Sequence, residues 1–218
     1  AKARDRAVLN LSQIDEYRDA NPGSLFSAHL AKVKLSMKQC GEYLGFRHYY
    51  TVGKVRLHAA CFCKVQLLCP LCAIRRGSKT LESYTQRYHV INQETPGLKL
   101  SMLTLTVKNG DDLAERFEHL KKAVSTALER RRKTLAKRRG YNSDFAKIRG
   151  LVGSYEVTNK GNGWHPHAHI MILHSERIDA AQLKREWQSL TKDSRVLRID
   201  PAQHPDDPAK DFIEVLKY

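Results

Sequence analysis

Two neighbouring strands joined by a short connection constrain the fold of this chain more than any other feature. Residues 151–158 and 165–173 have the composition of strands, and the connection 159–164 contains two glycines, which predicts an antiparallel hairpin. Residues 100–107 (LSMLTLTV) alternate between apolar and polar side chains and predict a further strand. Helical patterns do not alternate regularly with these strands. We therefore expect an α+β fold with a central antiparallel sheet and flanking helices.

Helical patterns lie on both sides of the predicted sheet. Polar residues 1–36 predict short helices around a turn at 21–24, and Asp207 followed by Pro208 predicts the start of a last helix. Three longer helices are expected over 74–90, 113 to about 139, and 182–190, with a short strand over 195–199. The expected parts are an N-terminal helical segment (1–36), a cysteine-rich region with its following helix (37–90) and a core domain (91–218).

The chain carries a large positive charge. Its 38 Lys and Arg residues against 23 Asp and Glu residues leave a net charge of +15 and a pI near 9.7. A chain this basic is expected to bind a polyanion, most often nucleic acid. Seven cations fall within ten residues at the end of the helix predicted from residue 113, more than a solvated helix end needs. The predicted phosphate contacts there are Arg130, Arg131, Arg132, Lys133, Lys137, Arg138 and Arg139.

Neither a membrane span nor a secretory signal is recognisable. No apolar run approaches the roughly 20 residues that cross a bilayer, and the N-terminus has no apolar stretch behind its charges. We expect a cytoplasmic protein with reduced cysteines and no membrane partner. The chain lacks an initiator Met and stops at a tyrosine, so further domains are expected beyond residue 218.

The strand predicted over 165–173 begins with three histidines within five residues. Alternate side chains of a strand share a face, so His167 and His169 point the same way, while His165 lies beyond Pro166 and its direction is open. On the preceding strand Glu156 is the one ionisable residue of its face, and closure of the hairpin brings it opposite the histidines. Two imidazoles and a carboxylate with open positions suit Mg²⁺ or Mn²⁺ bound to a substrate phosphate. Core packing is the less favoured explanation, since each buried imidazole would need a partner.

Four of the five cysteines lie within twelve residues and predict a structural Zn²⁺ site. Cys69 and Cys72 form a C-x-x-C knuckle, and Cys63 precedes it. The remaining ligand is open from the residues alone, because spacing favours Cys61 over Cys40, and His58 is also near.

Three motifs in order resemble those of the His-hydrophobic-His (HUH) endonucleases, and within them the rolling-circle replication initiators of the pC194/pUB110 plasmid family. Residues 101–109 (SMLTLTVKN) are similar to the first motif, 154–173 (SYEVTNKGNGWHPHAHIMIL) to the metal motif, and 214–218 (EVLKY) to the tyrosine motif. The family's C-G, F-C-K and C-P-x-C pattern matches Cys40, Cys63, Cys69 and Cys72, which implies these four as zinc ligands. Ala168 is small for the hydrophobic position, and the pair at 67–68 adds a residue before Cys69.

The resemblance implies a mechanism and partners. A divalent ion held by Glu156, His167 and His169 would polarise a DNA phosphate, and Tyr218 would attack it, leaving a 5′-phosphotyrosine link and a 3′-OH primer. Glu214, one helical turn before Tyr218, would activate water for the terminal hydrolysis, and Lys217 would stabilise the phenolate or the phosphate. The zinc part would support or recognise the origin, with Arg75 and Arg76 touching DNA. Single-stranded or hairpin origin DNA, a host helicase and a host polymerase are the expected partners.

Three other functions are compatible with parts of the sequence. A transposase or relaxase of the HUH superfamily would share the histidines and the tyrosine but would not need Glu214. A histidine-triad nucleotide hydrolase would match the segment HPHAHIMI loosely, with Pro166 in its first hydrophobic position, and would not need the charge or the cysteines. A zinc-dependent DNA-binding protein without catalysis would leave the histidines incidental.

Overall fold

The computed structural model describes residues 2–194, 196–204 and 206–216. The chain divides into two compact units, residues 1–80 and 81–218, with the boundary inside helix α3 (Pro70–Glu94). Each unit has its own core, so each is described by itself. Among the described residues, no helix combines the length and the apolar character needed to cross a membrane.

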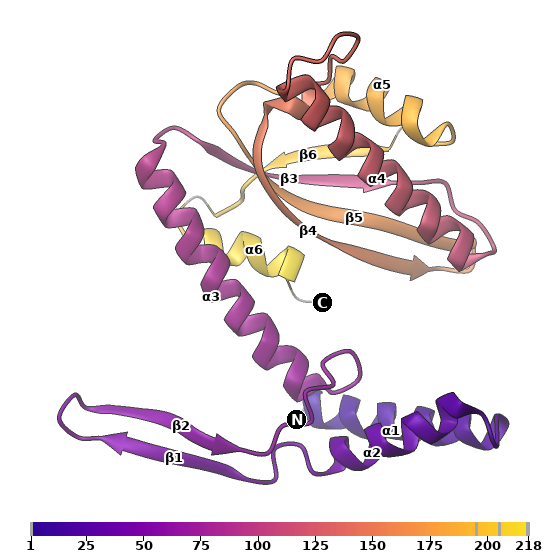
Figure 1. Cartoon of the computed structure of the whole chain (residues 1–218), viewed down its shortest axis with the longest axis vertical. Helices are drawn as coiled ribbons and strands as arrows, with labels where there is room; N and C mark the ends of the chain where they lie inside the picture. The colour runs from indigo at the N-terminus through magenta and orange to yellow at the C-terminus, as the bar shows by residue number, and fades with distance from the viewer. Residues whose placement is uncertain (1, 195, 205, 217–218) are drawn as a thin grey trace. The chain divides into compact units, whose positions relative to one another are not determined.

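The first unit combines two helices, a hairpin and the start of α3 (Figure 1). Helices α1 (Lys2–Ala20) and α2 (Leu25–Lys38) flank the turn predicted at 21–24, and Ser24 caps α2 by accepting a hydrogen bond from the backbone N–H of Ser27. Strands β1 (Leu44–Tyr49) and β2 (Lys54–Ala60) form an antiparallel pair. Apolar side chains of α1 and α2 pack around the cysteines in one small core: Ile14, Leu30, Val33, Met37, Cys69 and Cys72.

The second unit is built on a four-stranded antiparallel sheet with the strand order β4-β5-β3-β6 (Figure 1). Its strands are β3 (Lys99–Thr106), β4 (Ile148–Asn159), β5 (Trp164–His174) and β6 (Leu197–Pro201). Its other elements are α4 (Leu113–Leu135), the 3₁₀ turn η1 (Asp144–Lys147), α5 (Ala180–Thr191) and α6 (Pro208–Leu216). These observations confirm the α+β class and the antiparallel hairpin of residues 151–173.

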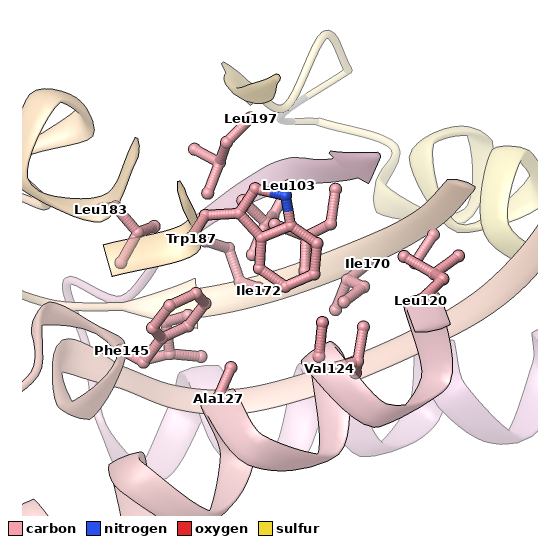
Figure 2. Packing of buried hydrophobic residues seen from close by; sticks show 14 of the residues in the cluster. Leu103, Leu120, Val124, Ala127, Phe145, Ile170, Ile172, Leu183, Trp187 and Leu197 are labelled. Carbon is pink, nitrogen blue, oxygen red and sulfur yellow. The ribbon is translucent and has the colours of Figure 1, made fainter. Parts of the chain in front are cut away.

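The two faces of the sheet are covered by different helices. Even-numbered residues of β5, such as Ile170 and Ile172, pack with α4, α5 and η1 in the main core around Trp187 (Figure 2). Odd-numbered β5 residues, such as Met171, pack with Phe212 and other residues of α6. A fully buried aliphatic side chain such as Ile172 stabilises the fold by about 1.5–3 kcal/mol. Strand alternation therefore sends the odd-numbered histidines of β5 to the face that α6 covers.

Several element boundaries differ from the sequence-based expectation, and three of the differences concern the ends of α4, α3 and the last strand. Helix α4 ends at Leu135 rather than near residue 139, because Ala136 caps it and Lys137 adopts a positive φ of 51°. Helix α3 begins at Pro70 rather than 74, since proline is well suited to a first helical turn. The last strand of the sheet is Leu197–Pro201 rather than 195–199, and residue 195 lies outside the described residues.

Candidate functional site

The register of β4 and β5 places a carboxylate opposite two histidines. Glu156 pairs with His167, and Ser154 pairs with His169, so the three functional side chains share one face of the hairpin. Ligand atoms of Glu156, His167 and His169 all lie within 4.8 Å of one another. Glu156 Oε2 is 3.2 Å from His167 Nε2 and 3.7 Å from His169 Nε2.

Hydrogen bonds orient both imidazoles toward Glu156. His167 Nδ1 donates to the carbonyl of His165 at 3.2 Å, and His169 Nδ1 is hydrogen-bonded to Thr104 Oγ1 at 3.2 Å. With Nδ1 of His167 protonated, its Nε2 presents a lone pair to the carboxylate, which also offers only lone pairs. Two acceptors in contact need a positive charge between them, which either a proton on His167 Nε2 or a metal ion can supply.

Burial makes this positive charge more necessary. The side chains of Glu156 and His167 are only 15% and 11% exposed. Glu156 Oε1 is buried and, within the described part of the chain, has no hydrogen-bond partner. An uncompensated buried carboxylate oxygen is costly. The donor set fits a hard divalent cation with open positions, and ligand bonds of about 2.0–2.2 Å are compatible with the observed separations.

Proline and glycine set the start of the histidine strand. The backbone N–H and C=O of Trp164 both bond to Gly110, which follows β3, so these groups of Trp164 point toward β3. The backbone of Pro166, two residues further on, points the same way. Thr106, the last β3 residue in the ladder, pairs with His167, so Pro166 lies beyond the paired part of β3. Its missing N–H therefore costs no ladder bond there, as expected for proline at the end of a strand.

His165 lies beside the metal-binding group without belonging to it. Its Nδ1 donates to Asn109 Oδ1 at 2.7 Å, and its ring stacks on that of His167 with centroids 5.4 Å apart. Burial lowers the pKa of His165, and the neighbouring His167 and Lys160 lower it further. Sequence reasoning did not single out Asn109 or Thr104 as partners of these histidines. The alternation of β3 was the available signal, since Thr104 and Thr106 share the histidine face.

Helix α6 packs on the same face of the sheet as this group. Phe212 and Val215 are buried against Met171, two residues along β5 from His169. Ile213, between them in sequence, is 44% exposed. Glu214 is exposed on α6, whereas Lys217 and Tyr218 lie outside the described residues.

Four cysteines of the first unit form a second group that could hold a metal: Cys40, Cys63, Cys69 and Cys72. Three pairs of their sulfur atoms lie 3.5–3.6 Å apart. A tetrahedral Zn²⁺ with Zn–S bonds of about 2.3 Å would hold its sulfurs about 3.8 Å apart. Cys61 is exposed and outside the group, and His58 is also outside it.

The environment of the thiols favours a bound cation. Burial raises the pKa of Cys40 to about 11 and raises the pKa of Cys63 as well. At Cys69 burial also disfavours the thiolate, but the backbone N–H of Cys72 and the neighbouring thiols lower the pKa below its ordinary value. Without a metal the group can therefore carry little negative charge, whereas a bound Zn²⁺ would displace the protons.

The predicted DNA contacts on α4 divide into engaged and exposed cations. Arg131 donates to the carbonyl of Ile148 at 2.9 and 2.7 Å, Arg130 donates to Ser189 Oγ, and Lys133 bonds Glu129 and Tyr141. Arg131 is therefore a structural residue as well as a cation. The exposed members are Arg132, Lys137, Arg138 and Arg139, and of these the last three follow the end of the helix.

These features define a class of protein. Its members are α+β chains that carry a carboxylate and two histidines on an antiparallel sheet, and a separate group of four cysteines. The family model Rep_1, described as "Replication protein", matches residues 54–204. The chain belongs to this family of replication proteins. The family match confirms the resemblance to replication initiators that the motifs indicate.

Curated relatives of this chain carry the name "Protein rep". One from Bacillus sp is 30% identical over 190 residues, covering 85% of this chain and 58% of the relative. One from Bacillus amyloliquefaciens is 28% identical over 189 residues, covering 85% and 52%. One from Streptococcus pneumoniae serotype 2 is 30% identical over 188 residues, covering 78% and 53%. The chain thus spans about half the length of these relatives. No solved structure matches it.

Proposed function

We propose that this chain is the origin-nicking part of a plasmid rolling-circle replication initiator. It would cut single-stranded DNA at the origin with Tyr218 as nucleophile. The observation that carries the proposal is the group of Glu156, His167 and His169, whose ligand atoms lie within 4.8 Å of one another on the sheet face that α6 covers. Tyr218 follows the last residue of α6 by two positions. Membership of the replication protein family supports the same function.

The proposed chemistry assigns a role to each residue. A Mg²⁺ or Mn²⁺ ion held by Glu156, His167 and His169 would supply a Lewis acid that offsets charge on the scissile phosphate. Tyr218 Oη forms a bond to phosphorus, the P–O3′ bond breaks, and the phenolic proton is passed to the departing 3′ oxygen through solvent or a nearby base. The products are a 5′-phosphotyrosine and a free 3′-OH. Lys217 would stabilise the developing phenolate, and Glu214 would activate the water that ends the round.

The remaining assignments form part of the same proposal. Zn²⁺ would be held by Cys40, Cys63, Cys69 and Cys72 and would stabilise the first unit. The exposed cations after α4, together with Arg75 and Arg76, would contact DNA phosphates. The functional parts would be residues 1–36, 37–90 and 91–218. A host helicase and a host polymerase would act at the 3′-OH, and the reaction would take place in the cytoplasm.

Covalent capture of DNA tests the nicking proposal. The chain is incubated with Mn²⁺ and a pool of random-sequence single-stranded oligonucleotides, labelled at either the 3′ or the 5′ end. The expected result is a denaturant-resistant adduct that carries the 3′ label and lacks the 5′ label, because tyrosine retains the 5′ phosphate. Absence of an adduct with both Mn²⁺ and Mg²⁺ would contradict the proposal.

Matched variants assign the roles. Tyr218→Phe should abolish the adduct, whereas Tyr155→Phe, which changes a tyrosine of β4 that packs against Phe117 of α4, should retain it. Glu156→Gln should reduce both Mn²⁺ binding and adduct formation. Glu214→Ala should form the adduct but fail to release it by hydrolysis. Unchanged release would refute the role of Glu214.

Elemental analysis tests the zinc assignment. Wild-type protein should contain about one zinc per chain, as four thiolate ligands imply. Cys69→Ser should lose it, while Cys61→Ser, the variant of the exposed fifth cysteine, should retain it. Equal zinc loss in the two variants would contradict the assignment of the four ligands.

A further inference from the structure

The hairpin of β1 and β2 is a two-stranded ribbon whose side chains are almost all exposed. Ten of the thirteen residues of β1 and β2 are exposed, and the other three are half-buried: Gly45, Ala59 and Ala60. In Figure 1 the ribbon extends away from α1 and α2 of the same unit. An isolated two-stranded ribbon is only marginally stable in water. Its persistence therefore requires an anchor at its root.

The four-cysteine group supplies this anchor. Cys40 precedes β1 and Cys63 follows β2, so both ends of the ribbon enter the same cluster. Backbone bonds close the root, since Gly41 N donates to Cys61 O at 2.8 Å and Cys61 N donates to Tyr43 O at 3.0 Å. The ribbon is thus a projecting element held at one end, a form suited to insertion into a groove.

The two faces of the ribbon differ in chemistry. Residues that pair across an antiparallel ladder lie on the same face. Arg47 pairs with Arg56, and Tyr49 pairs with Lys54, which gives a cationic face. The opposite face carries two further pairs that are largely apolar: Phe46 with Leu57, and His48 with Val55.

The cationic face is unfavourable without an anionic partner. Two arginines directly opposite each other destabilise a ladder, by an amount comparable to the gain from a favourable pair. Arg47 donates to His58 Nε2 at 2.9 Å, and among the described residues it forms no ion pair with a carboxylate. Indeed, residues 43–81 contain seven Lys and Arg and no Asp or Glu. A polyanion is the partner whose charge complements this surface.

A cationic hollow continues this surface at the root of the ribbon. It has a volume of about 240 Å³ and is lined by Leu57, His58, Phe62, Lys64 and Arg75, among others. The guanidinium of Arg75 lies 4.4 Å from the centre of the Phe62 ring. Stacking of this kind restrains the orientation of arginine while leaving its N–H groups available to a phosphate.

We propose that the cationic face of the β1–β2 ribbon enters the major groove of duplex DNA, with Arg47 and Arg56 as its principal contacts. The major groove of B-DNA, about 12 Å wide, admits a two-stranded β-ribbon, and arginine is the side chain best suited to phosphates and guanine edges there. The choice of DNA rests on the proposed function. The first unit would then bind duplex DNA, a role separate from the single-strand cleavage at the Glu156 group.

Fluorescence anisotropy of the full zinc-loaded chain tests this role. The probes are a labelled 30-base-pair DNA duplex, its single strand, and an RNA duplex of the same sequence, each titrated at several salt concentrations. The test variant is Arg47→Ala/Arg56→Ala. The control, Lys32→Ala/Lys38→Ala, removes the same charge from exposed positions of α2. Zinc content and circular dichroism verify that both variants are folded.

The observed association constant K falls as salt rises, and the slope of log K against log salt reports the number of phosphate contacts. Because Arg47→Ala/Arg56→Ala removes two such contacts, this slope should become shallower by about 1.8 for duplex DNA. Affinity near 0.1 M salt should then fall by about 10- to 100-fold. The control should change affinity less than about 3-fold, and RNA duplex binding should change little, because its major groove is too narrow for the ribbon. Wild-type affinity in the arginine variant, or equal losses in both variants, would overturn the proposal.

The single strand, the RNA duplex and the adduct assay distinguish duplex binding by the ribbon from nicking. A loss confined to the single strand would overturn the assignment to duplex DNA, and an equal loss on the RNA duplex would overturn groove insertion. The arginine variant should still form the Tyr218 adduct on single-stranded oligonucleotides if the proposed function is correct. A protein that forms no adduct but loses duplex binding in the variant would refute nicking alone.

Discussion

Trp187 connects the core of the second unit to the strand end beside the histidines, and its replacement by Phe has a predictable cost. Its side chain is fully buried, and Nε1 donates to the carbonyl of Thr106 at 2.8 Å. Thr106 in turn pairs with His167. Trp187→Phe therefore both opens a cavity in the core of Figure 2 and removes the donor from a buried carbonyl.

The expected loss has two parts. A buried carbonyl left without its donor costs about 1–3 kcal/mol. Replacing the indole by a phenyl ring leaves space for a few heavy atoms, which adds about 1–2 kcal/mol. The total loss in the free energy of unfolding is about 2–4 kcal/mol after partial relaxation. With an m-value of about 2 kcal/mol/M in urea, this lowers the unfolding midpoint by about 1–2 M.

Tryptophan fluorescence measures this loss selectively. The chain has two tryptophans, Trp164 and Trp187, and both belong to the second unit. In Trp187→Phe, Trp164 remains as the reporter of that unit in a urea titration. Trp164→Phe is the matched control, because Trp164 is only half-buried and its backbone bonds to Gly110 are retained. A loss below about 0.5 kcal/mol in Trp187→Phe, or an equal loss in the control, would refute the reasoning.

Three further perturbations have defined outcomes. Gly163→Ala and Gly161→Ala both place a side chain at a φ near +88°. Only at Gly163 would the new Cβ lie 3.0 Å from the Gly110 backbone. Gly163→Ala should therefore lower the melting temperature more than Gly161→Ala. The backbone N–H groups of Gln182 and Ala181 lower the pKa of Asp179, so its contribution is complete above the unfolded pKa of 3.8 and is lost as pH falls through the lower folded pKa. Asp179→Asn cannot titrate, and its melting-temperature deficit should shrink from pH 6 to about pH 3; a constant deficit would contradict this reasoning. Arg131→Ala should destabilise the second unit in urea by about 1–3 kcal/mol through its bonds to Ile148, whereas exposed Arg132→Ala should change stability by less than about 0.5 kcal/mol.

The sequence by itself determined the features that follow from local periodicity and chain connectivity. Alternation and a short glycine connection were sufficient to pair residues 151–158 with 165–173, and the period of two then put His167 and His169 on one face. The register that sets Glu156 against His167 also followed, because a short hairpin leaves few ways to align its strands. The motifs further indicated the replication initiator family, which the family match confirms.

Only the tertiary structure decided which distant groups meet. Spacing favoured Cys61, but the chain path brings Cys40 from the end of α2 to the other three thiols, whereas Cys61 faces outward. Asn109 and Thr104 reach the histidines because β3 pairs with β5 in one particular register. Arg131 turns inward because a carbonyl of β4 lies within its reach, whereas Arg132 next to it and the cations after the helix remain exposed. Local patterns specify the direction of a side chain within its element, but the neighbour that it meets depends on how the elements pack.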